Sequence, residues 1–507
     1  MNMRKAYRLI LAAAAAATYL WACGPVDDPV NNNENNQPET PVAAKPSEEI
    51  RQADQFAGDA LNVYYLWNRQ IKNDLNRLAP DTCMNPINVV HEIRYHQGSK
   101  EVDHWTQLTN NLGQMTSAVE GIGESYGYDL QAGRISNREG VYFLFVNYVT
   151  NDSPAQKAGL KRGDLIMTIG GEEITSSNIY DVFNKKNVKL GIAHMTADGY
   201  LGSVEKQVDL AAVDMWEDPV VVSKTFDVNG KKIGYLVYNS FDVKSMETLP
   251  DIFRKFKSEG IQELILDLRY NGGGFVNTEC ELASLIAPYA NVAAGDVFQT
   301  EVYNDLLAEA WKDEDFNTYF DTKHVYKTET YDISEDISDA NPGISKLYVI
   351  VTNNSASASE GLIVGLGPYM DITLIGEQTY GKYCAGYMMS PANLYGSQPK
   401  TDISKIDKWG IYVMVSQFAD KNGKNPANPD GIPVNIAAHD NPFDGYDLGD
   451  ENESMLRVAL TAAGKVYTKA PIGEGRKIDS ERLEHGMPKG ILIKSDLPSF
   501  SLPVVAE

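Results

Sequence analysis

Hydrophobic positions in the second half of the chain form short continuous runs separated by segments with helical spacing. The runs are five to seven residues long, which is typical of buried strands, and they are Lys232–Tyr238, Leu264–Leu268, Leu347–Val351 and Asp371–Ile375. Helical patterns occupy Lys244–Ser258 and Ala358–Leu366. Strands that alternate with helices predict a layered α/β core. We place this core at residues 214–465 of a multi-domain chain.

Two further regions flank this pattern with different compositions. Residues 48–109 show helical spacing around Ala53–Leu78 and contain the aromatic cluster Tyr64–Trp67. We expect an N-terminal helical region whose aromatic side chains pack into a core. Residues 466–507 form a C-terminal extension to which the sequence assigns no role.

The start of the chain predicts its compartment. Basic residues at positions 4, 5 and 8 precede an apolar run, Leu9–Trp21, that is too short to span a membrane and is typical of a signal peptide at residues 1–22. The run ends in Leu20-Trp-Ala-Cys23, which resembles a bacterial lipoprotein processing site, so Cys23 is expected to carry lipid. The alternative is an ordinary cleaved signal with an incidental cysteine. We therefore expect a bacterial cell-envelope protein, lipid-anchored to a membrane and periplasmic or surface-exposed.

The composition narrows the classes of partner. Residues 23–47 are rich in Asn, Pro and acidic residues and predict a disordered linker. A formal net charge of −24 disfavours nucleic acid as a partner. Beyond Cys23 there are three cysteines, Cys83, Cys280 and Cys384, whose spacing fits neither a disulfide framework nor a metal site. No metal or other cofactor is implied.

A serine cluster lies where a strand meets a helix. Residues Ser355–Glu360 read Ser-Ala-Ser-Ala-Ser-Glu and follow the turn Asn353-Asn354. Free N–H groups and the dipole at a helix start favour developing negative charge on a nearby oxygen. The next strand leads into a loop with Lys382, a candidate base. This arrangement predicts a Ser–Lys catalytic dyad.

Such a lysine has to be neutral to accept the serine proton. Near pH 7 its pKa must fall by about three units, which corresponds to roughly 4 kcal/mol. Burial without a carboxylate partner produces such a shift. The neighbours Tyr380, Tyr383 and Cys384 are compatible with burial.

A glycine triplet supplies the third chemical feature. Asn271-Gly-Gly-Gly274 follows the strand Leu264–Leu268, and glycine allows the backbone to approach a substrate closely. The N–H of Gly272 or Gly273, together with that of Ala358, would form an oxyanion hole. The sequence does not decide between the two glycines.

Together these segments resemble the carboxyl-terminal processing (tail-specific) serine peptidases over about residues 50–465. The resemblance places the nucleophile at Ser357, the general base at Lys382 and the family's strand-to-glycine turn at Leu266–Gly274. It implies a crotonase/ClpP-like α/β layered core. Family members often carry a glutamine four residues after the lysine, where this chain has Gly386.

Residues 110–213 resemble a PDZ domain. The supporting segments are Ser153–Ile166, which contains Ser-Pro-Ala, Ala-Gly and Gly-Asp, and the following Ile169-Gly-Gly171. Gly121, Ile122 and Gly123 match the loop that binds a peptide's terminal carboxylate. Such domains add their ligand as an extra strand on a sheet edge. A PDZ-like fold retained for structure or gating is the alternative.

The resulting hypothesis is a serine endopeptidase that captures the free C-terminus of a polypeptide and cleaves nearby through an acyl-enzyme. A phosphate-binding loop at Gly376–Lys382 is disfavoured because Tyr383 stands where magnesium binding needs Ser or Thr. Two alternatives remain. One is a non-catalytic PDZ peptide-binding lipoprotein, and the other is a serine hydrolase with His324 or His439 as the base. Asp267 and Arg269 are expected to form a buried structural ion pair.

Overall fold

The computed structural model describes residues 45–119, 122–135, 138–196, 198–328, 330–396, 403–426, 429–468, 480–483, 491–494 and 497. The chain divides into two units, Met1–Lys45 and Pro46–Glu507, and the features below belong to the second. The predicted signal peptide, Cys23 and most of the predicted linker lie outside the described residues. Within the described part, no helix combines the length and hydrophobicity required to cross a membrane.

The N-terminal region is helical, as its spacing predicts. It contains α2 (Glu48–Tyr64), η1 (Asp74–Leu78) and α3 (Pro86–Ile93). Helix α2 starts at Ser47, whose hydroxyl accepts a hydrogen bond from the N–H of Ile50 at 3.2 Å. The aromatic cluster is buried as expected, and the Tyr65 hydroxyl donates to Asp103 at 2.7 Å. Short elements follow: β1 (His96–Gln97), β2 (Lys100–Glu101), β3 (Gln107–Thr109) and α4 (Leu112–Val119).

The PDZ-like region forms a seven-stranded sheet with the order β10-β9-β7-β8-β6-β5-β25. Its members are β5 (Tyr128–Arg134), β6 (Val141–Val149), β7 (Leu165–Ile169), β8 (Glu172–Thr175), β9 (Asn187–Ala193), β10 (Lys206–Ala211) and β25 (Ser480–Arg482), with helices α5 (Pro154–Lys157) and α6 (Asp181–Asn184). A separate pair joins β4 (Ile122–Ser125) to β11 (Val213–Trp216). Ser153 caps α5 by accepting from the N–H of Gln156 at 3.1 Å, which explains the serine of the Ser-Pro-Ala motif.

The predicted α/β core is present as a six-stranded sheet with the order β12-β13-β14-β20-β21-β24. Its strands are β12 (Val220–Val228), β13 (Lys231–Tyr238), β14 (Glu263–Asp267), β20 (Lys346–Val351), β21 (Asp371–Gly376) and β24 (Ile436–Ala437). From β13 onward all neighbours are parallel. Such parallel strands are covered on both faces, which is why they read as continuous apolar runs.

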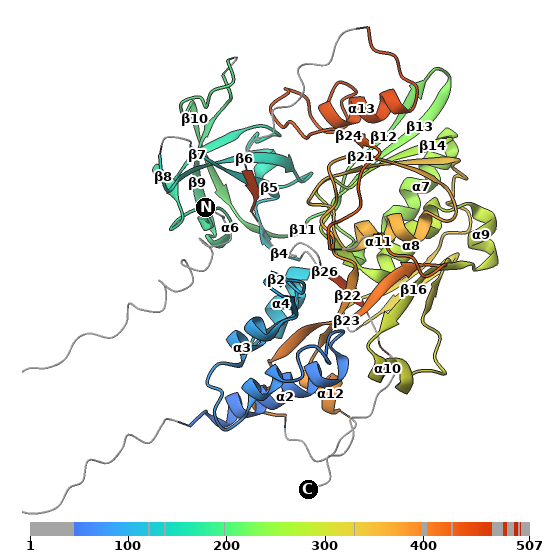
Figure 1. The fold of residues 1–507 in the computed structure, drawn as a ribbon. Helices are drawn as coiled ribbons and strands as arrows, with labels where there is room; N and C mark the ends of the chain where they lie inside the picture. Colours follow the sequence, from blue (N-terminus) through green and yellow to red (C-terminus); the bar gives the residue numbers. More distant parts are fainter. Residues whose placement is uncertain are drawn as a thin grey trace, which may run out of the picture. The chain divides into compact units, whose positions relative to one another are not determined.

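Helices cover both faces of this sheet (Figure 1). On one face, side chains such as Ile233 and Ile265 pack with Met455 and Leu460 of α13 (Ser454–Ala462). On the other, their neighbours pack against α7 (Leu249–Glu259), α8 (Val276–Ile286) and α11 (Ala358–Leu366). The 3-10 helix η2 (Val243–Glu247) and α9 (Tyr289–Ala294) complete this layer.

A second seven-stranded sheet lies on the opposite side of α11. It has the order β15-β26-β22-β23-β16-β17, with β3 also paired to β23. The strands are β15 (Gly273–Phe275), β26 (Ile491–Lys494), β22 (Cys384–Met389), β23 (Gly410–Asp420), β16 (Val297–Tyr303) and β17 (Asn317–Tyr319). The remaining elements are α10 (Asp305–Ala310), β18 (Lys323–Lys327), β19 (Asp332–Asp336) and α12 (Pro391–Tyr395).

A buried ion-pair network lies at the end of strand β14. Arg269 contacts Asp267 at 2.7 Å, as predicted, and also Glu453 at 2.7 Å and Asp440 at 2.8 Å. Arg162, from the PDZ-like region, pairs with Asp440 as well and donates to the hydroxyl of Tyr270 at 2.6 Å. Buried charges persist when they are paired and hydrogen-bonded in this way. The network holds the turn that leads into the glycine triplet.

Candidate active site

Ser357 stands at the N-cap of α11, directly after the turn that ends β20. It has a φ of 63° and a ψ of −113° and is fully buried. A non-glycine residue with positive φ is strained and persists only where its surroundings hold it. The N–H of Ala356 supplies one such constraint by donating to the carbonyl of Asn271 at 3.1 Å.

Hydrogen bonding separates the three serines of the cluster. Ser355 Oγ donates to the carbonyl of Leu268 at 2.7 Å, and Ser359 Oγ donates to the carbonyl of Asn271 at 3.0 Å. Ser357 Oγ, although buried, has no hydrogen-bond partner in the described part of the chain. Leaving a buried hydroxyl unpaired costs free energy, and such exceptions point to a functional role. The outer serines therefore hold the turn and the middle one is left for chemistry.

Glu360 connects the serine to the lysine loop. Its Oε2 accepts from the N–H of Ser357 at 3.0 Å and from the N–H of Lys382 at 2.9 Å. Its Oε1 accepts from the N–H of Gly381 at 2.8 Å and from the hydroxyl of Thr379. Burial raises the pKa of Glu360 to about 7, while these four donors oppose the rise. One carboxyl group thus fixes the two backbones relative to each other.

Lys382 is fully buried in an aromatic surrounding. Its Nζ donates to the hydroxyl of Tyr412 at 3.1 Å and lies 5.2 Å from the ring centroid of Trp105. Burial lowers the pKa of Lys382 from 10.5 to about 8, and electrostatic interactions with Cys384, Asp103 and Glu360 partly oppose this shift. The pKa of Lys382 is therefore lowered in the expected direction, to about 8 rather than to 7.

Ser357 Oγ and Lys382 Nζ do not form a hydrogen bond with each other in this structure, because Ser357 Oγ has no partner among the described residues. The two residues are held together through their backbones by Glu360. In structures without substrate, catalytic hydrogen bonds are often long and tighten only when substrate is bound.

The glycine turn supplies backbone donors beside Ser357. The N–H of Gly273 donates to the side chain of Asn271 at 2.9 Å. In the described part of the chain, the N–H of Gly272 has no recorded acceptor, and that of Ala358 opens α11, where no intrahelical acceptor exists. Of the two glycines left open by the sequence, Gly272 is therefore the freer donor.

Gly386 occupies the position where the related family often has glutamine. A Cβ at this position would lie 2.5 Å from ring atoms of Tyr412 and 2.5 Å from the Met414 Cε. The ring of Tyr412 thus fills the space that a side chain at 386 would need. Its hydroxyl is the group that contacts the lysine amine. The sequence shows that position 386 lacks the family's glutamine. It does not reveal that Tyr412, 30 residues from Lys382 along the chain, contacts the lysine amine instead.

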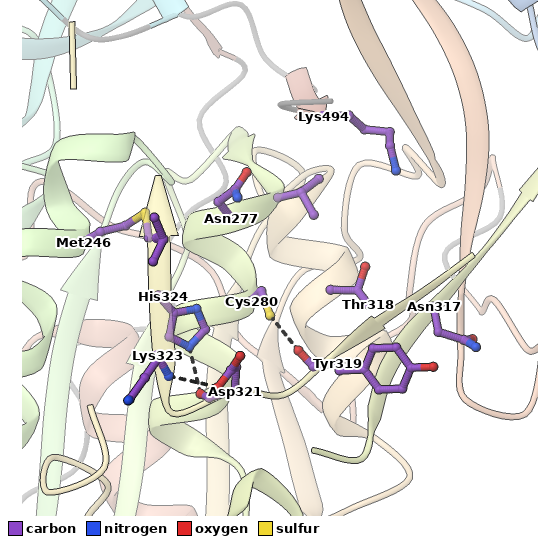
Figure 2. Close-up of a pocket in the computed structure, with 12 residues that line it drawn as sticks. Met246, Asn277, Cys280, Asn317, Thr318, Tyr319, Asp321, Lys323, His324 and Lys494 are labelled. Carbon is purple, nitrogen blue, oxygen red and sulfur yellow. Dashed lines mark hydrogen bonds between the residues drawn. The ribbon is translucent and has the colours of Figure 1, made fainter. Parts of the chain in front are cut away.

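The alternative nucleophile and bases are engaged elsewhere. Cys384 is buried, contacts Met414 sulfur at 3.5 Å, and has a pKa raised by burial to about 12. His439 contacts Glu377 at 2.7 Å, and His324 contacts the carbonyl of Asp321 at 2.8 Å. Figure 2 shows His324 beside Cys280 in a separate pocket of about 330 Å³. Neither histidine contacts Ser357 Oγ.

The predicted carboxylate-binding loop is only partly described. Gly121 lies outside the described residues. Ile122 and Gly123 belong to β4, where their backbones pair with Trp216 and Met215 of β11. Within the described residues, no group of three or more His, Cys, Asp or Glu side chains is arranged to hold a metal ion.

Two parts of the chain match known protein families. A model of peptidase family S41 matches residues 232–438, and a PDZ domain model matches residues 145–183. A carboxyl-terminal-processing protease of Picosynechococcus sp. is 24% identical over 285 residues, which cover 55% of this chain and 60% of the relative. A CtpA-like serine protease of Staphylococcus aureus is 26% identical over 375 residues, which cover 72% of this chain and 64% of the relative.

A solved structure shows the same fold. The crystal structure described as an S41 protease from Bacteroides fragilis aligns with a TM-score of 0.62 at 24% identity, covering 80% of this chain and 96% of that one. The matches to the curated relatives span less than two thirds of their length. The α/β core and the PDZ-like sheet agree with these matches, and the serine and lysine segments lie within the residues matched to family S41. Residues 232–438 thus match peptidase family S41, and the segment that matches a PDZ domain, residues 145–183, precedes them.

Proposed function

We propose that this chain is a serine endopeptidase that cleaves polypeptides near their C-terminus with Ser357 as nucleophile and Lys382 as general base. The observation that carries the proposal is the state of the two side chains. One is a buried, unpaired hydroxyl, and the other is a buried amine with a lowered pKa, and both residues are anchored to Glu360. The names of the relatives support the same activity.

The first step is acyl transfer. Neutral Lys382 accepts the proton of Ser357 Oγ as that oxygen attacks the scissile carbonyl carbon. The charge that develops on the carbonyl oxygen is met by the N–H groups of Gly272 and Ala358 at the start of α11. Lys382 then passes its proton to the leaving amine. This releases the C-terminal fragment and leaves an ester on Ser357.

The second step is hydrolysis of that ester. Lys382, neutral again, removes a proton from water as the water attacks the acyl carbon, and then returns it to Ser357 Oγ. Tyr412 receives the ammonium N–H during the interval in which the lysine is charged. Burial among Trp105 and Tyr412 keeps competing water from stabilising that charge.

The PDZ domain is proposed to hold the substrate's end. A PDZ sheet binds an extended peptide by adding it as a strand. The edge of β5 that faces away from β6, where β25 pairs in this structure, is the strand position that follows the predicted carboxylate loop in sequence. Anchoring of the chain to a membrane through Cys23 in a bacterial cell envelope is proposed from the leader-like sequence alone.

The test is cleavage of defined peptides by residues 24–507. We expect this protein to cleave unstructured peptides with a free C-terminus and to be labelled at Ser357 by a fluorophosphonate. Ser357→Ala should do neither. Equal cleavage of amidated and free-ended peptides would remove terminal recognition while leaving peptidase activity. Cleavage by Ser357→Ala at the parent rate would overturn the assignment.

A further inference from the structure

The C-terminal extension returns to the PDZ sheet. Strand β25 (Ser480–Arg482) pairs antiparallel with β5, with Ser480 opposite Gly133 and Arg482 opposite Gln131. The N–H of Leu483 continues the ladder by donating to the carbonyl of Leu130 at 3.0 Å. Leu483 is buried in the hydrophobic core of the PDZ domain. The chain itself therefore supplies the edge strand in the manner by which such sheets take a peptide.

Arg482 fixes this strand at both sides. Its guanidinium pairs with Asp129 of β5 at 2.6 Å and donates to the carbonyl of Tyr270 at 2.6 Å. Tyr270 directly precedes Asn271 and the glycine triplet. A charge-assisted, largely buried pair of this kind is among the stronger hydrogen-bonded contacts. The side chain thus links the PDZ strand to the turn beside Ser357.

The next described stretch enters the catalytic sheet. Strand β26 (Ile491–Lys494) lies parallel between β15 and β22. Ile491 pairs with Gly273 and Leu492 with Gly274, whereas Ile493 pairs with Gly386. One neighbour therefore carries the glycine turn and the other begins two residues after Lys382. The strand position between the oxyanion turn and the lysine segment is filled by the chain's own backbone.

Side chains of β26 reinforce this position. Ile493 is 5% exposed and belongs to a hydrophobic core cluster with Cys384 and Met414. Lys494 forms an ion pair with Glu301 of β16. Lys494 also lines the pocket between α8 and β17, across from Asn277 (Figure 2).

We propose that residues Ser480–Leu483 and Ile491–Lys494 are a built-in peptide ligand that occupies the two strand positions a polypeptide substrate has to enter. The docking itself stands on the pairing above, whereas its effect on substrates rests on the proposed peptidase function. A tethered segment competes at an effective concentration that reaches about millimolar for short linkers. Substrates therefore have to displace the segment before they bind. The apparent KM is the KM of the undocked protein divided by the fraction of chains in which the segment is undocked.

The first experiment measures docking without catalysis. Hydrogen–deuterium exchange is followed in residues 24–507 carrying Ser357→Ala. We expect amides of 491–494 to exchange at least about tenfold more slowly than in an unstructured chain, because they are hydrogen-bonded to β15 and β22. Adding Ile493→Asp should abolish this protection and speed exchange in β22, because a carboxylate would replace a buried apolar group. Exchange of 491–494 at unstructured rates in the parent overturns the proposal.

A matched variant controls for the substitution itself. Val466→Asp makes the same kind of change at a residue of the same extension that is 83% exposed, and it should leave the exchange pattern unaltered. Arg482→Ala provides a second test at the other site, where it should deprotect β5. Unchanged protection of 480–483 in Arg482→Ala would overturn the role of that side chain as an anchor.

The second experiment measures competition with Ser357 restored. With an unstructured free-ended peptide, Ile493→Asp should lower KM by about 5-fold or more, and Val466→Asp should not. If the amides of 491–494 are protected in the parent and Ile493→Asp nevertheless leaves KM unchanged, the ligand role is overturned. Protected amides with no cleavage by any variant would instead overturn the peptidase proposal and leave the docking intact.

Discussion

The N–H groups of Ser357 and Lys382 donate to the same carboxylate oxygen, Glu360 Oε2, at 3.0 and 2.9 Å. This shared acceptor brings together two residues, Ser357 and Lys382, that are 25 residues apart along the chain. It also explains how a strained serine and a buried lysine keep a constant backbone separation while their side chains remain unbonded to each other. The geometry therefore depends on the glutamate as much as on the two reacting groups.

Glu360→Gln should lower kcat/KM by about 10- to 100-fold without unfolding the protein. The amide replaces one acceptor oxygen with a donor, so at least one of the N–H groups now faces another N–H. The measurement is kcat/KM together with the thermal midpoint. Glu281→Gln is the matched control, because Glu281 is also a buried glutamate and burial raises its pKa to about 9, so it is already neutral at pH 7. Equal losses in both variants would contradict the positioning role of Glu360.

Lys382→Met should abolish cleavage and yet stabilise the fold at pH 7. The folded-state pKa of about 8 lies below the unfolded value of 10.5. The folded protein therefore holds a charged amine at a cost below pH 8, and stability rises as the pH increases from about 8 to 10.5. Removing the amine should raise the free energy of unfolding at pH 7 by about 3 kcal/mol, with the gain vanishing near pH 11.

Urea unfolding at pH 7 and at pH 10.5 measures this difference. Lys346→Met is the control, because Lys346 forms an ordinary surface pair with Asp371 at 2.9 Å and should change stability by less than about 1 kcal/mol. A destabilised Lys382→Met protein at pH 7 would show that the amine is held charged and well solvated.

The activity should rise with pH through about 8, as Lys382 loses its proton. Tyr412→Phe should reduce kcat by about 10-fold, because the amine loses the hydroxyl that orients it. It should also shift the acidic limb of the kcat/KM profile to lower pH, since the ammonium loses a hydrogen-bond acceptor. Tyr348→Phe is the control, because the Tyr348 hydroxyl contacts the carbonyl of Ala462 at 3.5 Å and the side chain of Glu263, and neither group belongs to the site around Ser357. A lower kcat with an unmoved limb would indicate a structural role alone.

Iodoacetamide should leave the activity intact, whereas a fluorophosphonate should remove it. Burial raises the pKa of the Cys384 thiol to about 12, so almost no thiolate exists near pH 8. Inactivation kinetics with both reagents, followed by mass spectrometry of the labelled peptide, identify the modified side chain. Rapid alkylation of Cys384 coupled to loss of activity would favour the cysteine as nucleophile.

Gly386→Ala should impair both folding and catalysis. The added methyl group would overlap the Tyr412 ring and the end of Met414 at 2.5 Å. We expect a loss of roughly 1–3 kcal/mol in unfolding free energy, as is usual for overpacking, together with reduced kcat. Gly58→Ala is the comparison, since a Cβ there meets nothing within 4 Å and alanine favours the helix α2.

The sequence by itself determined the strands, the helices and the chemistry of the loops. The runs around Leu264–Leu268 and Leu347–Val351 are apolar throughout because parallel strands are covered on both faces, so local pattern was sufficient. We could identify three candidate segments from the sequence because each follows such a strand: the serine cluster, the loop with Lys382 and the glycine triplet. The pairing of Asp267 with Arg269 was also predicted, since two residues alternate to one face of an extended segment.

Only the tertiary structure decided the state of the site. The pKa of Lys382 depends on Trp105 and Tyr412, which lie far from it in sequence, because desolvation is set by whatever surrounds a group in space. The choice of Ser357 over its neighbours rests on hydrogen bonds to Leu268 and Asn271. The docking of Ile491–Lys494 beside Gly273 could not be predicted from the sequence. Backbone pairing depends on an open strand position in the folded sheet more than on particular side chains.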